Sequence, residues 1–293
     1  MPPGTEFLGE TTPMAETPQK VEKAYNNIEF LNSPDARVLR MLAEFLEPMR
    51  RFRKEKIRDT IVFFGSARVQ SKAEATKALR SIESEPRKGR ASDPAREQRL
   101  ADAKVDLKMS RYYEDAVELA RLLTVWASKI DHQRRFVVCS GGGPGIMEAA
   151  NRGAALAKGK TIGLNISLPF EQYPNPYIPP ELNFEFHYFF MRKFWFVYLA
   201  KALVMFPGGF GTLDELMEVL TLMQTSKVKK KMSVVLYGRD YWEEVLNFKA
   251  MVAHRVISKD DLALFRFADT PEEAYRYLTK ELKLNYPKDV GDV

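Results

Sequence analysis

Two stretches of this sequence decide its fold: CSGGGPGIME at residues 139–148 and FPGGFGTLDE at residues 206–215. Each follows an apolar, strand-like run, and each passes through glycines into a helical segment. Glycine lets the backbone approach a ligand without Cβ collisions, and the N–H groups and dipole of a helix N-terminus attract anions. A third, shorter junction, Gly65–Arg68, follows the apolar run 60–64. We therefore expect three strand-to-helix junctions that bind phosphate.

Outward from these junctions, short β-rich runs alternate with amphipathic stretches from Thr60 onward, which predicts an α/β protein with a Rossmann-like, doubly wound parallel sheet covered by helices on both faces. In such a sheet the loops leave the carboxyl ends of the strands, so the three junctions are expected to line one cleft. The predicted strands are 60–64, 136–140, 161–166, 202–206 and 233–237. The predicted helices are 112–129, 146–158, 213–224, 241–253 and one that begins near Thr270.

Two regions depart from this alternation. Residues 1–56 are expected to form a proline-containing tail followed by a helix at about 35–56, whose spacing places six apolar side chains on one stripe: Val38, Leu39, Leu42, Phe45, Leu46 and Met49. Residues 57–293 are expected to form the nucleotide-binding domain. Within it, the charged stretch at about 70–110 carries few large apolar residues and is interpreted as an insertion.

The composition limits the classes of partner. The 45 Lys and Arg against 39 Asp and Glu give a formal net charge of +6, but the basic residues form no concentrated face or recognisable nucleic-acid-binding module. The run 227–231 is interpreted as the polar last turn of a helix. Charged residues interrupt the aromatic stretch 184–206, so we expect no membrane partner. The single cysteine, Cys139, fits a buried strand in a reducing compartment, and no signal peptide is apparent, which predicts a cytoplasmic protein.

Several alternative chemistries lack their residues. A dinucleotide-dependent dehydrogenase needs an acidic residue at the end of the next strand, where Asn165 stands, and neither glycine loop ends in the Gly-Lys pair of a Walker motif. The three histidines show no metal-ligand spacing, and no serine nucleophile elbow is present. We therefore expect no metal and no cofactor.

Four charged residues near the loops have two interpretations each. Thr212 and Glu215 lie at capping-box spacing, so Glu215 closes the start of a helix, lies beside a bound phosphate, or does both. Glu148 has the same position after Gly145. Arg192 and Lys193 stand among aromatic residues, where a cation needs an anionic partner such as a phosphate or Glu215, or else extends to water.

The two loops, at 140–151 and 207–215, together closely resemble the LOG ("Lonely Guy") family, as do Gly65–Arg68 and Met191–Lys193. The resemblance extends over roughly Ile57 to Leu282, outside the insertion. Family members are cytokinin riboside 5′-monophosphate phosphoribohydrolases with a Rossmann-like fold, and many bacterial members hydrolyse AMP to adenine and ribose 5-phosphate. They are often labelled lysine decarboxylases, but no Schiff-base lysine setting for pyridoxal phosphate is recognisable in this sequence.

The resemblance implies that Arg192 and Glu215 are the catalytic pair. It also implies that the nucleotide and its phosphate are bound by Gly65, Ser66, Arg68, Gly141, Gly142, Gly143, Gly145, Glu148, Lys193, Gly208, Gly209, Gly211 and Thr212. The family's arginine motif usually has His where this chain has Phe190, a departure that bears on substrate preference. The added N-terminal helix and the insertion make the chain similar to longer members, which form homodimers or larger homo-oligomers. A non-catalytic nucleotide-binding or carrier protein of the same fold is the alternative, but both catalytic positions are present.

Overall fold

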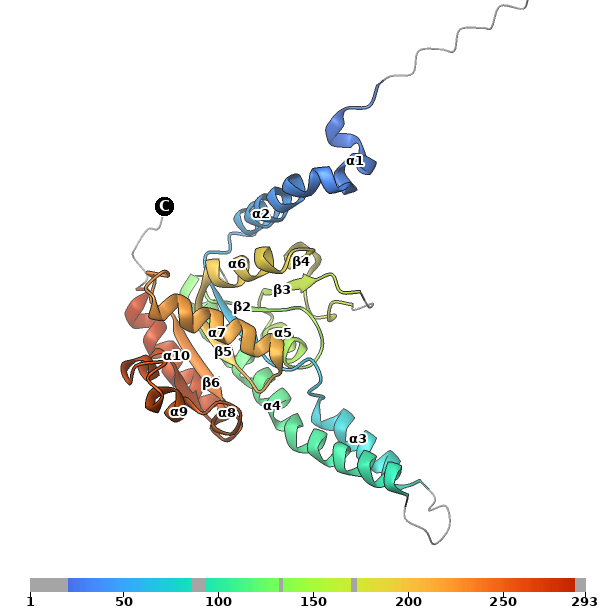
Figure 1. Cartoon of the computed structure of the whole chain (residues 1–293), viewed down its shortest axis with the longest axis vertical. Helices are drawn as coiled ribbons and strands as arrows, with labels where there is room; N and C mark the ends of the chain where they lie inside the picture. Colours follow the sequence, from blue (N-terminus) through green and yellow to red (C-terminus); the bar gives the residue numbers. More distant parts are fainter. Residues whose placement is uncertain (1–20, 86–92, 132–133, 170–172, 288–293) are drawn as a thin grey trace, which may run out of the picture. The chain divides into compact units, whose positions relative to one another are not determined.

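The computed structural model describes residues 21–85, 93–131, 134–169 and 173–287. The tail expected at the N-terminus falls mostly on residues 1–20, outside the described residues. By its contacts the chain divides into Met1–Ala43 and a larger compact unit, Glu44–Val293. The latter holds all the strands (Figure 1).

The core of the larger unit is one sheet of seven parallel strands in the order β4-β3-β2-β1-β5-β6-β7. The strands are β1 Thr60–Phe64, β2 Val137–Ser140, β3 Thr161–Ile166, β4 Asn183–Phe186, β5 Ala200–Met205, β6 Ser233–Tyr237 and β7 Arg266–Ala268. The predicted doubly wound α/β fold is therefore confirmed.

The strand order places the glycine junctions together. β1 pairs with β2 on one side and with β5 on the other, so the chain reverses its direction of progress across the sheet at β1. A doubly wound sheet has its ligand crevice at this reversal, outside the carboxyl ends of the strands. The loops after β1, β2 and β5 are the three predicted junctions, and they leave neighbouring strands.

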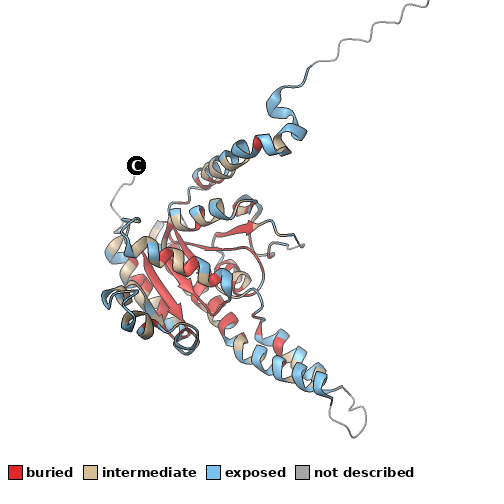
Figure 2. Cartoon of the chain, viewed as in Figure 1, coloured by how far each residue is buried: buried red, intermediate tan, exposed pale blue. Residues whose placement is uncertain are grey.

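Helices cover both faces of the sheet, and Figure 2 shows its strands almost entirely buried. The helices are α1 Ile28–Asn32, α2 Arg37–Lys54, α3 Lys72–Glu83, α4 Pro94–Asp131, α5 Ile146–Leu156, α6 Phe189–Leu199, α7 Phe210–Gln224, α8 Arg239–Val245, α9 Phe248–Ala253 and α10 Pro271–Asn285. Residues of α4, α5 and α10 share one core with one face of the sheet, whereas residues of α6 to α9 and the end of α2 share the other.

Strand β1 shows why its sequence is apolar throughout. Ile61 and Phe63 belong to the first core, while Val62 and Phe64 belong to the second. Successive side chains of a strand point to opposite faces, so a strand covered on both sides buries every residue. Cys139 of β2 is likewise buried with a free thiol, as expected from the sequence.

The charged insertion is a helical hairpin. α3 begins with a capping box, in which Ser71 and Glu74 satisfy each other's backbone N–H groups, and it packs along α4. The helix predicted at 112–129 is longer than expected, because the second half of the insertion continues into it without a break as the 38-residue α4. The N-terminal half of α4 carries few large apolar residues, and among the described residues it runs beside α3 and away from the sheet (Figure 1).

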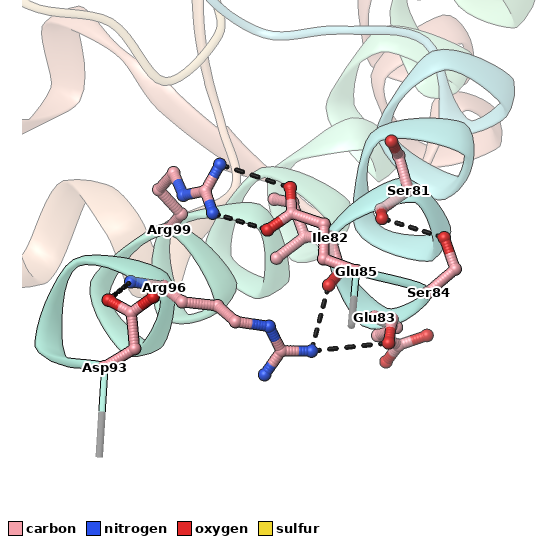
Figure 3. Close-up of polar contacts among 8 residues, drawn as sticks. All are labelled: Ser81, Ile82, Glu83, Ser84, Glu85, Asp93, Arg96 and Arg99. Carbon is pink, nitrogen blue, oxygen red and sulfur yellow. Dashed lines mark hydrogen bonds and ion pairs between the residues drawn. The ribbon is translucent and has the colours of Figure 1, made fainter. Parts of the chain in front are cut away.

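Arginines hold the free end of this hairpin together (Figure 3). Arg99 forms two hydrogen bonds with the Glu85 carboxylate, and Arg96 donates to the carbonyls of Ile82 and Glu83 near the end of α3. Cations close to the last carbonyls of a helix satisfy acceptors that have no partner within the helix. Some of the basic residues of the predicted insertion therefore bind the backbone at the end of a helix.

The predicted apolar stripe of the N-terminal helix divides into two kinds of residue. Phe45 packs against the Phe194 and Trp195 rings at centroid distances of 5.5 and 5.9 Å, and Met49 is partly buried in the same core. The other members, Val38, Leu39, Leu42 and Leu46, are exposed. In the smaller unit, Arg40 donates to the carbonyls of Leu31 and Ser33, which fixes the turn between α1 and α2.

Four predictions of local structure were wrong. Strands β4 and β7 were missed because β4 alternates buried and exposed residues over only four positions and β7 has three residues. The single helix predicted at 241–253 is two helices, α8 and α9, because Asn247 caps a new helix. The run 227–231 follows α7 rather than ending it, and Lys230 donates instead to the carbonyls of Val197 and Tyr198 at the end of α6. No helix of the described chain is long and apolar enough to cross a membrane.

Candidate active site

The three glycine junctions are joined directly by backbone hydrogen bonds. Ser66 donates its N–H to the Pro207 carbonyl at 2.9 Å and accepts from the Ile146 N–H at 3.1 Å. Because Ser66 lies after β1, Pro207 after β5 and Ile146 at the start of α5, one residue connects all three junctions. The expectation that the three loops lie together at one edge of the sheet is met.

The glycines of the first loop and of the junction after β1 are required by packing. Gly142 and Gly145 have φ angles of +78° and +70°, a region that side chains with a Cβ disfavour. A Cβ on Gly142 would meet the Asn165 side chain, one on Gly145 would meet the Ser66 carbonyl, and one on Gly65 would meet Ile146. These positions are glycine because their surroundings leave no room.

The glycines of the second loop differ from one another. Gly208 is confined by Thr212 and by the Ser66 backbone. A Cβ on Gly209 or Gly211 would meet nothing within 4 Å, and Phe210 between them is 93% exposed. Packing within the chain therefore does not explain these two glycines, whereas close approach of a ligand to the N-terminus of α7 does.

A buried amide network, which no sequence pattern predicted, holds the first loop. Asn175 donates from its backbone N–H to the Gly142 carbonyl at 2.8 Å, and its side-chain Nδ2 donates to the carbonyls of Gly142 and Gly143. Nδ2 also contacts Asn151, which accepts from Ser140 Oγ at 2.7 Å. The loop thus has a fixed shape. Asn175 stands between two prolines in a connecting segment, where neither helical nor strand periodicity marks it.

Glu215 does not cap a helix. α7 begins at Phe210 after Gly209, which makes Thr212 its third residue and excludes the capping box that the spacing suggested. Glu215 is 7% exposed, and its Oε2 atom has no hydrogen-bond partner within the described residues. Burial raises the pKa of Glu215 to about 7, and the charges of Lys193 and Arg192 only partly oppose this rise. A buried carboxylate oxygen without a partner requires an explanation, and a ligand supplies one.

Arg192 is the cation that faces this site. Its Nε donates to the Leu164 carbonyl at 2.8 Å, and its guanidinium lies 5.1 Å from the Phe196 ring centroid. A Cβ on Gly141 would lie 2.5 Å from its Nη2, so the first loop borders the guanidinium. Burial lowers the pKa of Arg192, and the charge of Glu215 is the largest effect opposing this shift. No ion pair within 4.0 Å joins Arg192 to a carboxylate of the described chain.

Lys193 has other partners than the phosphate or Glu215 considered from the sequence. Its Nζ lies 2.8 Å from Asp214 and 2.9 Å from Glu218, and these ion pairs tie α6 to α7. Burial alone would lower the pKa of Lys193, but its contacts with the two carboxylates raise it overall. Lys193 therefore aligns the helices that carry Arg192 and Glu215. The two acidic partners were missed because a contact between two helices leaves no local pattern.

The remaining predicted residues occupy different positions around the loops. Glu148, in the first turn of α5, accepts a hydrogen bond of 2.9 Å from the Tyr113 hydroxyl. Thr212 is buried against Gly208, Ser66 Oγ accepts from the Arg68 N–H, and the Arg68 side chain is exposed. The structure thus places Arg192, Glu215 and the loop glycines at one edge, with Glu148 and Lys193 engaged by neighbouring side chains.

This arrangement can hold an anion on backbone N–H groups and place a carboxylate and a guanidinium beside it. The Ile146 N–H of α5 already donates to Ser66, but the N–H groups that follow it and those that begin α7 have no acceptor within their own helices. No group of three or more His, Cys, Asp or Glu residues in the described ranges could hold a metal ion. The class defined by this fold is a Rossmann-like α/β protein with three glycine junctions at the carboxyl ends of adjacent strands.

Comparison with known proteins places the chain more narrowly. Residues 147–278 match the family model described as "Possible lysine decarboxylase". The pyrimidine/purine nucleotide 5′-monophosphate nucleosidase of Escherichia coli strain K12 is 27% identical over 191 residues, which cover 57% of this chain and 40% of the nucleosidase. The chain thus matches less than half the length of this relative. The matches confirm the resemblance to the LOG family.

Solved structures are similar to this chain at lower sequence identity. The Moco carrier protein from Chlamydomonas reinhardtii is 17% identical, with 78% of this chain and 99% of that chain covered and a TM-score of 0.44. The molybdenum cofactor binding protein from Rippkaea orientalis is 20% identical, with 58% and 86% covered and a TM-score of 0.41.

Proposed function

We propose that the chain hydrolyses the N-glycosidic bond of nucleoside 5′-monophosphates, AMP or an N6-modified AMP such as a cytokinin riboside monophosphate, to free base and ribose 5-phosphate. The observation that carries this proposal is the buried Glu215 carboxylate, whose Oε2 has no partner among the described residues, beside Arg192 at the glycine loops. The 27% identity to a nucleotide 5′-monophosphate nucleosidase supports the same reaction.

The reaction breaks the bond between C1′ of the ribose and the base nitrogen. The bonding electron pair leaves with the base, which takes up a proton, and a water oxygen bonds to C1′ while the water loses a proton. Positive charge develops on the ribose ring as the base departs. A carboxylate at this point stabilises the charge or receives the proton of the attacking water, a contribution of about 10²- to 10⁴-fold in rate.

Each part of the site has a role in this reaction. The glycine loops hold the 5′-phosphate, so that binding energy remote from the breaking bond positions the ribose. Arg192 orients the nucleotide and, through its charge, favours the ionised form of Glu215. Burial of Glu215 makes the unbound carboxylate costly, and this cost is relieved when the charged transition state forms beside it.

The test is incubation of the purified chain with AMP, GMP, CMP and N6-isopentenyl AMP, followed by chromatography for free base. Release of base from at least one of them, and its loss in Glu215→Gln, is the expected result. Binding of AMP without turnover, unchanged in Glu215→Gln, would instead identify a nucleotide carrier. We also propose that the chain acts in the cytoplasm as a homodimer or larger homo-oligomer, without a metal or cofactor, which light scattering and metal analysis of active protein would test.

A further inference from the structure

A second, basic cavity lies at the amino ends of the strands, opposite the glycine loops at their carboxyl ends. Its volume is about 420 Å³, within the range of small-molecule sites. Arg58 and Asp59 precede β1, Arg135 precedes β2, and Lys201 is the second residue of β5, so these lining residues stand at the amino ends of three adjacent strands. The site proposed above lies at the carboxyl ends of the same strands.

The cavity has an excess of positive charge. Four cations line it, Arg53, Arg58, Arg135 and Lys201, against a single carboxylate, Asp59. That carboxylate is already engaged, because it accepts from the Phe136 N–H at 2.5 Å and from Arg135 Nε at 3.1 Å and is 3% exposed. Asp59 therefore pairs with Arg135 and is also attracted by Lys201, and four cations against this one carboxylate leave the lining with a net positive charge.

Two of these cations have only weak partners. Arg53 Nη2 donates to the thioether of Met49, which is a poor acceptor, and Lys201 Nζ lies 4.6 Å from the Tyr286 ring centroid. Neither forms an ion pair with a carboxylate in the described part of the chain. Burial lowers the pKa of nearby Lys230 to about 7, and the charge of Lys201 adds to this shift.

The other wall of the cavity is apolar and aromatic. Phe52 of α2 and Trp195, Tyr198 and Leu199 of α6 line it. A simple inorganic anion would satisfy the cations but leave this wall unused, whereas an aromatic group attached to the anion would cover it. A phosphate monoester carries about −1.5 to −2 charges at neutral pH. Such a ligand balances two cations better than a ligand with a single carboxylate group does.

We propose that this cavity binds a phosphate monoester that carries a flat aromatic group, at a site separate from the glycine loops. The phosphate contacts Lys201 and Arg53, and the aromatic group lies against Tyr198, which is 52% exposed. This inference does not depend on the reaction proposed above, because it rests on residues at the other edge of the sheet.

Phenyl phosphate is the probe, titrated into the full chain by calorimetry at low ionic strength and followed in parallel by tryptophan fluorescence. We expect binding that weakens about tenfold in Lys201→Met and in Arg53→Met, the loss typical of one charge-assisted contact. Lys280→Met removes an exposed cation of α10 that does not line the cavity, and it is expected to bind as the parent does. Arg53 is exposed, so its variant tests the site even if Lys201→Met does not fold.

Two further arms separate this site from the glycine loops. Phenyl phosphate is expected to bind equally well to Glu215→Gln with and without saturating ribose 5-phosphate, which fits the glycine loops but has no aromatic group. Inorganic phosphate is expected to bind more weakly than phenyl phosphate. Absence of binding, equal binding by Lys201→Met, Arg53→Met and Lys280→Met, or full displacement by ribose 5-phosphate would overturn the proposal. Equal affinity for inorganic phosphate would overturn the role of the aromatic wall.

Discussion

The two glycine loops look alike in sequence, but they are glycine-rich for different reasons. In the first, Gly142 and Gly145 have positive φ angles and no room for a side chain, and Asn175 fixes the loop from the other side. In the second, Gly209 and Gly211 face open space one turn before the buried Glu215. The first loop is therefore a rigid support, whereas Gly209 and Gly211 leave the surface of the second loop accessible. Substitutions at Gly142 and Gly145 should therefore cost stability, whereas substitutions at Gly209 and Gly211 should cost function.

The largest effect is expected from Glu215→Gln, which keeps the size of the side chain and removes its charge. Hydrolysis of AMP should fall by about 10²- to 10⁴-fold, because the carboxylate no longer stabilises the ribosyl centre or accepts a proton. Initial rates of base release measure this. Glu97→Gln, which makes the same exchange at an exposed position of α4, is the matched control and should retain the activity. Comparable losses of activity in both variants would mean that the Glu215 carboxylate has no catalytic role of its own.

The same substitution should stabilise the fold at high pH. The pKa of Glu215 is about 7 in the folded chain and near its ordinary value of 4.5 when unfolded, so the folded state binds more protons between these values. Wild-type stability therefore falls as pH rises through this window, whereas the neutral glutamine of the variant does not titrate. The advantage of Glu215→Gln should grow to roughly 2–4 kcal/mol at pH 8 relative to pH 4. Urea unfolding at both pH values measures it, and a pH-independent difference would contradict the burial argument.

In the first loop, Gly142→Ala should destabilise the fold by about 1–3 kcal/mol, because the φ angle of +78° disfavours alanine and the new methyl group meets Asn165. Gly209→Ala is the control from the second loop, since its φ is −85° and its surroundings are empty. The two unfolding free energies are compared at one pH. Equal costs would mean that the two loops do not differ in the way described.

The smallest effect is expected from Gly211→Ala, at the second position of α7. Alanine has the higher helix propensity, so the variant should be more stable by up to about 0.5–1 kcal/mol. Its methyl group occupies surface that is open to a ligand, so the KM for AMP should rise while the fold strengthens. Thermal unfolding and steady-state kinetics on one preparation test both parts. A stabilised variant with unchanged KM would show that the ligand does not approach α7 at this point.

Much of the fold could be predicted because strands covered on both faces are mostly apolar runs, as in β1 and β6. Edge strands β4 and β7 were missed because short, partly exposed strands lack that pattern. That the second half of the insertion and the helix predicted at 112–129 form one helix was missed. The apolar spacing typical of a helix is weak where α4 runs beside α3 and away from the sheet.

The site divides in the same way. Arg192, Glu215 and the glycines could be predicted because each belongs to a contiguous motif next to a strand end. The partners of Lys193 and the clamp formed by Asn175 could not be predicted. Both depend on contacts between segments that are apart in the sequence and come together only in the folded chain. Whether Glu215 capped its helix could not be decided from spacing, because the answer depends on α7 beginning two residues before Thr212.

The rate of base release from AMP between pH 5 and pH 9 shows whether the ionised Glu215 drives hydrolysis at the second loop. The rate is predicted to rise with pH and to level off above an apparent pKa near 7, as the carboxylate loses its proton, and this rise should be absent from the residual activity of Glu215→Gln. A wild-type rate that is flat across this range or falls with rising pH, or a rise that persists in Glu215→Gln, would contradict the account.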